Sequence, residues 1–396
     1  MLNSFPLRQQ RLRRPFGNVA AAGLACVMNT GLACQREPPK QGIFIGAGFL
    51  SKDTYAELPE AARGRLEHIS VVTSPGPHRN KVAVCTNRHV WLIDPQTRKP
   101  TRSTPSPYRC LGAVPIDADG DGTLEVMCRG GGFSDVGLYD NDGNCLWERS
   151  GSPSAPPWTW WMSAGDLNRD GEMEFYLATT DGLKILDPSG KEAQHINAGQ
   201  HYMHVEVLDP GNGHDPMIIA SVQKWGSQLV ELRSPDGKLL RSFRPADKVH
   251  NFRALWWPVG DQRLRLLTYG STELWEGTRA RIVLLDGQGN VAFKHLLPSR
   301  MGSPSGAQGT FVRFLSDEPH YLAILLGFRS ANRHSVLYLF SLDGTVVYGE
   351  VLPRTWGIAV KPSSNGEEIL LVGNGRRKVA CYRRGKERLG IGTKRP

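Results

Sequence analysis

The sequence predicts an all-β fold, a seven-bladed β-propeller of four-stranded antiparallel blades. Three observations indicate it: Asp/Gly-rich turns recur at seven places, their spacing is roughly 40 to 55 residues, and the runs between them alternate between apolar and polar residues. The 396 residues include 44 Gly and 27 Pro, which suits a chain rich in strands and turns. Long helical periodicity is absent from the sequence. A β-sandwich, or two separate all-β domains, is the alternative.

The recurring turns mark the end of the third strand in each repeat unit. Six of them contain an Asp, and they lie at Asp94, Asp142, Asp187, Asp236, Asp286 and Asp343. A seventh, degenerate turn is Cys381–Gly385. Runs such as Leu183–Leu186 and Val336–Phe340 alternate as strands do. Seven turns at the same phase of the repeat therefore predict seven blades.

The seventh unit stops after its third strand, Lys378–Tyr382. An N-terminal strand is then needed to complete the last blade, and we expect Ile43–Ile45 to supply it. Joining the two ends of the chain in this way closes the ring and leaves no sheet edge free for aggregation. The resulting boundaries are an export signal at 1–34, a tether with the closure strand at 35–66, the propeller at 67–385, and a basic tail at 386–396.

Two loops in the second and third units carry oxygen-bearing side chains at alternate positions. The first loop has Asp117, Asp119, Asp121 and Glu125, and the second has Asp166, Asn168, Asp170 and Glu174. Such a run curls so that alternate side chains converge, and Gly122 or Gly171 relieves the bend. Hard oxygen ligands suit Ca²⁺, so both loops are predicted calcium sites. The alternative is that they are ordinary Asp/Gly turns between strands.

These two loops resemble the calcium loops of FG-GAP/VCBS-type repeats, as found in integrin α-subunit propellers and related bacterial proteins. A strand follows each loop, and the last acid comes eight residues after the first, so an EF-hand is excluded. The resemblance implies one stabilising Ca²⁺ in each loop. Loops of that family usually end in Asp, and the departure at Glu125 and Glu174 puts bidentate binding by the last acid in doubt.

The run Tyr139–Trp147 is similar to the docking turn of quinoprotein-type propellers, Asp-x-x-x-Gly-x-x-x-Trp, with one residue fewer between Asp and Gly. That similarity implies that Trp147 packs onto the neighbouring blade. The corresponding residue of the third unit is Gln194, and no other unit repeats the full pattern. The similarity therefore supports blade geometry and not a quinone cofactor.

The N-terminus has the character of an export signal. An apolar run, Val19–Met28, follows a basic segment and is too short to span a bilayer as a helix. Arg13–Phe16 resembles the core of a twin-arginine signal, although Leu12 stands where Ser or Thr is usual. Gly-Leu-Ala-Cys ends at both Cys26 and Cys34 and resembles a bacterial lipoprotein cleavage box. We expect an exported protein that is periplasmic, attached to the outer envelope, or extracellular, and which Cys is lipidated stays open.

The net charge of +10 comes from the two ends of the chain. Residues 1–33 hold four Arg and no acid, and the last 21 residues hold nine Lys or Arg against one Glu. The rest of the chain is left at about −2, so no basic stripe for nucleic acid is predicted. We expect a monomeric propeller that touches a membrane only through an N-terminal lipid anchor.

Aromatic and imidazole side chains gather in the segments that lead from one unit into the next. In a propeller these segments open on one face, around the central channel. The candidate ligand-binding residues there are Trp160, Trp161, His201, Tyr202, His204, His250, Arg253 and Trp356. Such a mouth would suit a planar, anionic or sugar-like ligand. The structural alternative is that the rings pack between blades and that each His is a hydrogen-bond partner.

Catalytic signatures are missing from the sequence: it has no Gly-x-Ser-x-Gly elbow, no His-Glu-x-x-His, and no phosphate-binding loop. We therefore expect a calcium-stabilised binding or interaction module at the cell envelope, with a protein or a carbohydrate as partner. Two alternatives stay open. One is a propeller enzyme acting on a polysaccharide or another small ligand at the mouth, and the other is a passive subunit of an envelope complex.

Overall fold

A computed structural model describes residues 42–59, 66–71, 81–86, 89–105, 112–121, 123–129, 135–140, 142–149, 157–211, 213–224, 227–246, 252–258, 264–270, 281–297, 304–328, 334–355, 357–363, 367–375 and 377–385. The predicted export signal at 1–34 and the predicted tail at 386–396 lie outside these residues. All regular structure in the described part of the chain is strand, and no helix there could cross a membrane.

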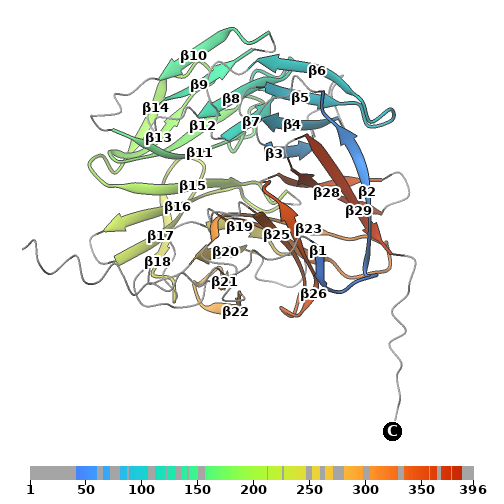
Figure 1. Cartoon of the computed structure of the whole chain (residues 1–396). Coiled ribbons are helices and arrows are strands. Elements are labelled where there is room, and N and C mark those ends of the chain that lie inside the picture. The colour runs from blue at the N-terminus through green and yellow to red at the C-terminus, as the bar shows by residue number, and fades with distance from the viewer. Residues whose placement is uncertain are drawn as a thin grey trace, which may run out of the picture. The chain divides into compact units, whose positions relative to one another are not determined.

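Seven antiparallel sheets follow one another around a ring (Figure 1). This confirms the predicted all-β, seven-bladed propeller. Blade one consists of β3 (Leu66–Val71), β4 (Val82–Thr86), β5 (His89–Ile93) and β6 (Pro100–Pro105). Blade two consists of β7 (Gly112–Ile116), β8 (Glu125–Arg129), β9 (Val136–Tyr139) and β10 (Cys145–Arg149). Blade three consists of β11 (Thr159–Gly165), β12 (Glu174–Thr179), β13 (Gly182–Leu186) and β14 (Glu192–Ile196).

The remaining blades continue the same order from inner to outer strand. Blade four consists of β15 (Tyr202–Leu208), β16 (Met217–Lys224), β17 (Ser227–Arg233) and β18 (Leu239–Phe243). Blade five consists of β19 (Phe252–Trp256), β20 (Leu264–Gly270), β21 (Arg281–Asp286) and β22 (Val291–Leu296). Blade six consists of β23 (Pro304–Val312), β24 (Tyr321–Phe328), β25 (His334–Ser341) and β26 (Val346–Pro353). Blade seven has β27 (Ile358–Pro362), β28 (Glu368–Asn374) and β29 (Lys378–Arg384).

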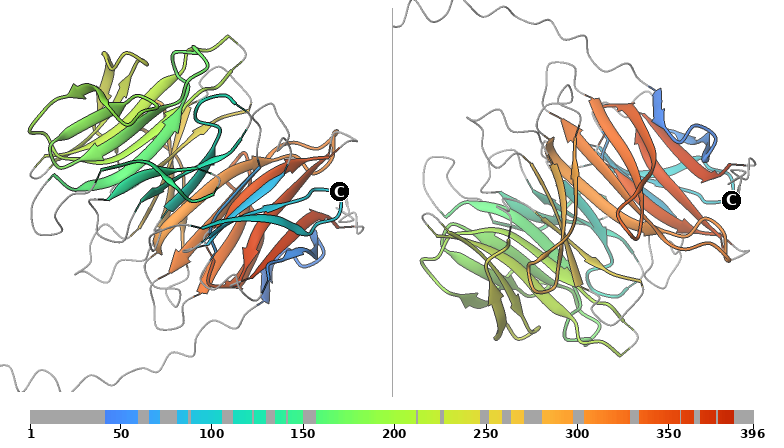
Figure 2. Two further views of the ribbon diagram at one scale, coloured as in Figure 1. Left: turned by 90° about the horizontal axis from the view of Figure 1, so that it is seen from above. Right: turned by 90° about the horizontal axis from the view of Figure 1, so that it is seen from below.

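An N-terminal strand completes the last blade, as predicted, but it is β2 (Leu50–Glu57) rather than Ile43–Ile45. β2 pairs antiparallel with β29 along its length, with Asp53 opposite Cys381. Ile43–Ile45 belongs to β1 (Gly42–Ile45), which adds a fifth strand to blade six by pairing with β26. In Figures 1 and 2 the blue N-terminal strands lie beside the orange and red C-terminal strands.

The choice of closing strand follows from length and chemistry. β2 offers eight residues to the seven of β29, whereas β1 offers only four. An outer strand faces solvent, so the polar sequence of β2 suits the position better than the short apolar run of β1. Between the two strands, Gly46 and Gly48 adopt φ values of 69° and 89°, which favour glycine and let the chain turn from one blade to the next.

The recurring Asp turns have a common local cause. In blade three the carboxylate of Asp187 accepts hydrogen bonds from the backbone N–H groups of Ser189 and Lys191, both at 3.0 Å. Asp140 and Asp286 make the equivalent pairs of bonds in blades two and five. An Asp side chain that satisfies its own turn is the reason that Asp recurs where the third strand ends.

In blades two to five the outer strand also lays one side chain over the turn of the next blade. Trp147 of β10 covers Gly190 of blade three, and its Nε1–H donates to the Pro188 carbonyl at 3.0 Å. The same relation joins Gln194 to Gly237, Phe243 to Gly289 and Phe293 to Gly344. The predicted packing of Trp147 onto a neighbouring blade is confirmed, and the contact recurs with other flat side chains.

Candidate functional site

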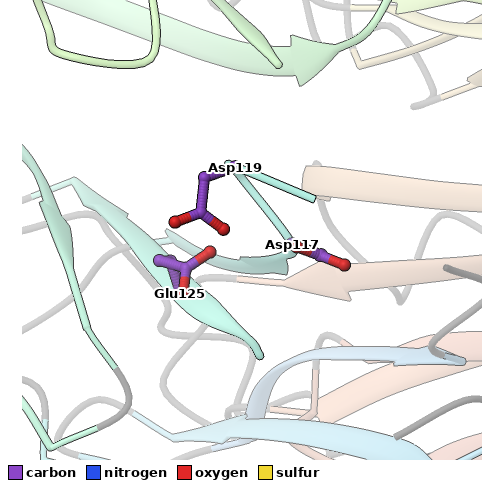
Figure 3. A group of neighbouring side chains, drawn as sticks. All are labelled: Asp117, Asp119 and Glu125. Atoms are coloured by element: carbon purple, nitrogen blue, oxygen red, sulfur yellow. The ribbon is translucent and has the colours of Figure 1, made fainter. Parts of the chain in front are cut away.

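The first acidic loop follows β7 and brings three of its four predicted ligands together. Asp117, Asp119 and Glu125 each offer a carboxylate oxygen, and these oxygens all lie within 4.8 Å of one another (Figure 3). Asp117 and Glu125 are buried, and Asp119 is exposed. Asp121 is not part of this group, because its carboxylate accepts hydrogen bonds from the backbone N–H and the hydroxyl of Thr123, both at 2.6 Å.

Glu125 also holds the loop closed through hydrogen bonds of its carboxylate. Its Oε2 accepts a hydrogen bond from the backbone N–H of Ala118 at 2.7 Å, which closes the loop, and its Oε1, at 3.1 Å, shares the hydrogen bond of the Thr123 hydroxyl with Asp121. Burial raises the pKa of Glu125 above its ordinary value, although these hydrogen bonds oppose the shift. Since one carboxylate oxygen is committed to the backbone, the geometry offers a single oxygen, Oε1, toward the other two acids.

The second loop, between β11 and β12, is closed in the same way. Glu174 Oε2 accepts a hydrogen bond from the backbone N–H of Leu167 at 3.2 Å. The side-chain amide of Asn168 donates to Glu174 Oε1 at 2.6 Å and to Asp170 Oδ2 at 2.9 Å. Asp166 accepts from the backbone N–H groups of Asp170 and Gly171, both at 3.1 Å. The side-chain amide of Asn168 therefore lies between Asp170 and Glu174, at the place where a bound cation would contact their carboxylate oxygens.

The two loops touch each other and a third. The backbone N–H of Met173 donates to the Ala118 carbonyl at 3.4 Å, which joins the loops of blades two and three. Arg169 donates to the Asp209 carboxylate at 3.0 Å and to the His214 carbonyl at 3.1 Å in the corresponding loop of blade four. Three consecutive blades are thus connected through these loops, so a cation in one loop would stabilise more than its own blade.

Arg253 of β19 is the centre of a second polar cluster. Its guanidinium donates to the Glu206 carboxylate of blade four at 2.5 Å and to the Ala307 carbonyl of blade six at 3.1 Å. It also lies 4.7 Å from the ring centroid of Trp161 in blade three. One side chain therefore contacts three blades besides its own.

Trp161 is surrounded by imidazole and guanidinium groups. The His204 ring stacks on it at a centroid distance of 4.5 Å, and the Arg129 guanidinium lies 5.5 Å from its centroid. Arg129 also donates to the Trp160 carbonyl, which ties blade two to blade three. Stacked cations and rings of this kind stabilise the packing of neighbouring blades.

The charges in this cluster are set by burial and by Arg253. Burial lowers the pKa of His204, which is neutral at pH 7 as a result. Although burial opposes ionisation of Glu206, the Arg253 guanidinium holds the pKa of that carboxyl below its usual value. Burial, together with the charge of Arg253, lowers the pKa of His68 on β3 to about 4. Arg253 and Glu206 are consequently an ion pair beside two neutral imidazoles.

The predicted mouth residues divide into four groups. Trp161, His204 and Arg253 belong to the cluster above, and the ring of Trp160 lies 5.7 Å from that of His201, with both side chains half-buried. Tyr202 is fully buried between blades three and four, where its hydroxyl donates to Glu231 at 2.7 Å. His250 and Trp356 lie outside the described residues.

Sequence reasoning missed Glu206 and Arg129. Glu206 is two residues after His204 on one strand, and this spacing puts both side chains on the same face. That spacing was the one available signal, and in the structure His204 Nε2 lies 3.2 Å from Glu206 Oε1. The Arg253 partner of Glu206 and the Trp160 partner of Arg129 come from other blades. A separate cavity of about 470 Å³ is lined by Lys52, Glu350–Pro353, Asn374 and Lys378, and none of the predicted mouth residues lines it.

Comparison with known families gives a match over the region that contains both acidic loops. The family model of the FG-GAP-like repeat matches residues 117–177, which run from the first acidic loop through the second into β12. The chain is a seven-bladed β-propeller with an FG-GAP-like repeat. This repeat thus spans the junction of blades two and three. No curated protein matches the sequence.

Solved structures similar to this chain share its fold at low sequence identity. A crystal structure of BBS1N in complex with ARL6DN, soaked with lead, has a TM-score of 0.54 and 10% identity, over 88% of this chain and 98% of that chain. Kuenenia stuttgartiensis hydrazine synthase has a TM-score of 0.53 and 14% identity, over 78% of this chain and 92% of that chain. At these identities the likeness concerns the fold alone. An FG-GAP propeller fold suggests an interaction module.

Proposed function

We propose that this FG-GAP propeller is an exported binding module of the cell envelope, stabilised by Ca²⁺ in the loops of blades two and three. The observation that carries the proposal is the group of Asp117, Asp119 and Glu125, whose oxygens lie close enough together to share one cation. Three carboxylate oxygens of this kind match the preference of Ca²⁺ for hard ligands. The resemblance of the N-terminus to twin-arginine and lipoprotein signals supports export. Export would make the protein periplasmic, envelope-attached or extracellular.

The first loop is proposed as the tighter of the two calcium sites. Its oxygens already converge, whereas in the second loop the amide of Asn168 lies between Asp170 and Glu174. Binding there requires the Asn168 amide to turn its oxygen toward the ion, which costs the hydrogen bonds that its nitrogen makes. In each loop the Glu can provide one oxygen while the other closes the loop, so the departure from the usual Asp is compatible with monodentate binding.

The calcium proposal is tested by calorimetric titration of Ca²⁺ into chelator-treated full-length protein, followed by thermal unfolding. We expect Ca²⁺ to raise the melting temperature, and Asp119→Asn to weaken binding by roughly tenfold because it removes a charged ligand. Asp142→Asn, which changes an acid of a marker turn in the same blade, is the matched control and should leave the affinity unchanged. Equal affinities for wild type and Asp119→Asn would refute a site in the first loop.

The partner is proposed to bind at the mouth, with a protein or a carbohydrate as the two candidates. Trp160 and His201 support this assignment because they are half-buried and have no part in the Arg253–Glu206 ion pair. Capture of a partner by immobilised wild-type protein, compared with Trp160→Ala/His201→Ala, tests the site. Equal capture by both proteins would place the binding surface elsewhere on the propeller.

A further inference from the structure

Exposed apolar side chains are concentrated on the outer strands of two neighbouring blades. Among the described residues, five large apolar side chains are exposed, and four of them lie on β18 and β22. They are Leu239 and Leu240, which are 46% and 58% exposed, and Val291 and Leu296, which are 44% and 51% exposed. We refer to residues 238–244 and 291–296 as the blade four–five rim.

The two strands of this rim are connected where β18 ends. Phe243, at the end of β18, lies over Gly289 in the turn that precedes β22. The backbone N–H of Ala246 donates to the carbonyl of the same glycine at 2.9 Å. The end of one outer strand is therefore fixed to the start of the next.

A backbone irregularity explains why Leu239 and Leu240 both face solvent. In the pairing of β18 with β17, Arg241 is opposite Leu232 and Leu239 is opposite Arg233, so Leu240 has no partner and forms a β-bulge. A bulge breaks the alternation that would otherwise turn one of two consecutive residues inward. The result is a pair of leucines that protrudes from the edge of the blade.

The charged side chains within the rim are all positive. Its cations are Lys238, Arg241, Arg244 and Lys294, and neither rim segment contains an acid. The acids of the adjoining turns are engaged locally: Asp236 accepts a hydrogen bond from Ser234, and Asp286 accepts one from the backbone of Gln288. The four cations of the rim thus outnumber the two acids of the adjoining turns, and the charge around the apolar side chains is positive on balance.

We propose that the blade four–five rim binds the surface of an anionic membrane, with Leu239 and Leu240 inserted among the lipids and the flanking cations against the headgroups. Protruding leucines suit a soft interface, which needs no matching pocket, and the cations complement anionic lipid headgroups. This contact would be separate from the N-terminal lipid anchor, and it does not depend on calcium. It would turn the outer edge of blades four and five toward the membrane.

The test is co-sedimentation of the full-length protein with vesicles of phosphatidylglycerol and phosphatidylcholine in equal parts, and with vesicles of phosphatidylcholine alone. We expect binding to the anionic vesicles, weakened by salt, and a loss of about tenfold in affinity in Leu239→Ser/Leu240→Ser. Arg241→Glu should weaken binding in the same direction because it introduces repulsion. Far-ultraviolet circular dichroism with thermal unfolding checks that the variants stay folded.

Leu146→Ser is the matched control, because Leu146 is 53% exposed on the outer strand of blade two but has Glu148 beside it. It should leave vesicle binding unchanged. The proposal is overturned if the wild type does not bind anionic vesicles, or if the double variant and the wild type bind equally. It is also overturned if Leu146→Ser weakens binding as much as the double variant does. Loss of an acidic protein partner from the double variant, without vesicle binding by the wild type, would identify the rim as a protein-docking surface instead.

Discussion

The packing of Trp147 on Gly190 fixes how blade two fits against blade three. Gly190 adopts a φ of 78°, and a Cβ added to it would lie 2.6 Å from the indole ring. Trp147 also packs edge-on against Phe175 at a centroid distance of 5.1 Å. The position requires glycine for two separate reasons, its backbone conformation and the closeness of the ring.

Replacement of Gly190 by alanine tests these two requirements together. We expect Gly190→Ala to lower the free energy of unfolding by about 3 kcal/mol, through left-handed strain and the clash with Trp147. Gly199→Ala is the matched control: its φ is 82°, but a Cβ there would meet nothing within 4 Å. It should cost only about 1 kcal/mol. Equal losses in denaturant titrations would mean that the Trp147 contact contributes nothing.

Of the four residues that pack on a turn glycine of the next blade, only one could be predicted from the sequence. Trp147 belongs to a recognisable turn pattern, whereas Gln194, Phe243 and Phe293 perform the same packing with different side chains. What these residues share is a flat group at one position of the outer strand, and not a residue type. The recurrence therefore becomes visible only when the neighbouring turn glycine is placed beside each of them.

At the scale of elements, closure of the ring depends on the pairing of β2 with β29. Asp53 on β2 is directly opposite Cys381 on β29, and Cys381 is a free, buried thiol. Residues opposite one another in an antiparallel pair have Cα atoms about 4.5 to 5.5 Å apart, within the range that a disulfide bridges. The two ends of the propeller can thus be linked by one substitution.

We expect Asp53→Cys to form this disulfide under oxidising conditions and to stabilise the propeller by up to about 4 kcal/mol, because it closes a long loop of chain. The substitution also removes the exposed Asp53–Arg383 ion pair, which costs less than about 1 kcal/mol. The measurement is the melting temperature with and without reductant, with the disulfide confirmed by mass spectrometry.

Ser51→Cys provides the control for closure, because its partner on β29 is Arg383 and not a cysteine. It should show no reductant-dependent shift. If Asp53→Cys also melts at the same temperature in both conditions although the disulfide is present, separation of β2 from β29 does not limit the stability of the ring.

The acidic loops show how far the sequence predicts an element's chemistry. Alternating acids led us to expect that the oxygens of Asp117, Asp119, Asp121 and Glu125 converge, and in the structure those of Asp117, Asp119 and Glu125 lie near one another. They did not indicate that the Thr123 hydroxyl would hold Asp121 away from the group, or that the Asn168 amide would lie between Asp170 and Glu174. Local hydrogen bonds between short polar side chains decide these positions, and spacing alone carries no information about them.

At the scale of the whole propeller, Arg253 links blades that are distant in the sequence. Its contacts with Trp161, Glu206 and Ala307 come from three different blades. The sequence suggested Arg253 as a ligand-binding residue because it lies in a segment between two units. Its partners were not predictable, since Trp161, Glu206 and Ala307 come from three other blades and meet Arg253 only when the ring is formed.

We expect Arg253→Ala to destabilise the propeller by about 3 kcal/mol, because it leaves the Glu206 carboxylate largely buried without its cation. The double variant Arg253→Met/Glu206→Gln should recover part of this loss, since it removes both charges and keeps most of the volume. Arg169→Ala is the matched control: it breaks an exposed ion pair with Asp209 and should cost less than about 1 kcal/mol. Unfolding by guanidinium chloride measures all three. If Arg253→Ala were no more costly than Arg169→Ala, Arg253 would not hold the ring together, and its assignment to ligand binding at the mouth would again be the better explanation.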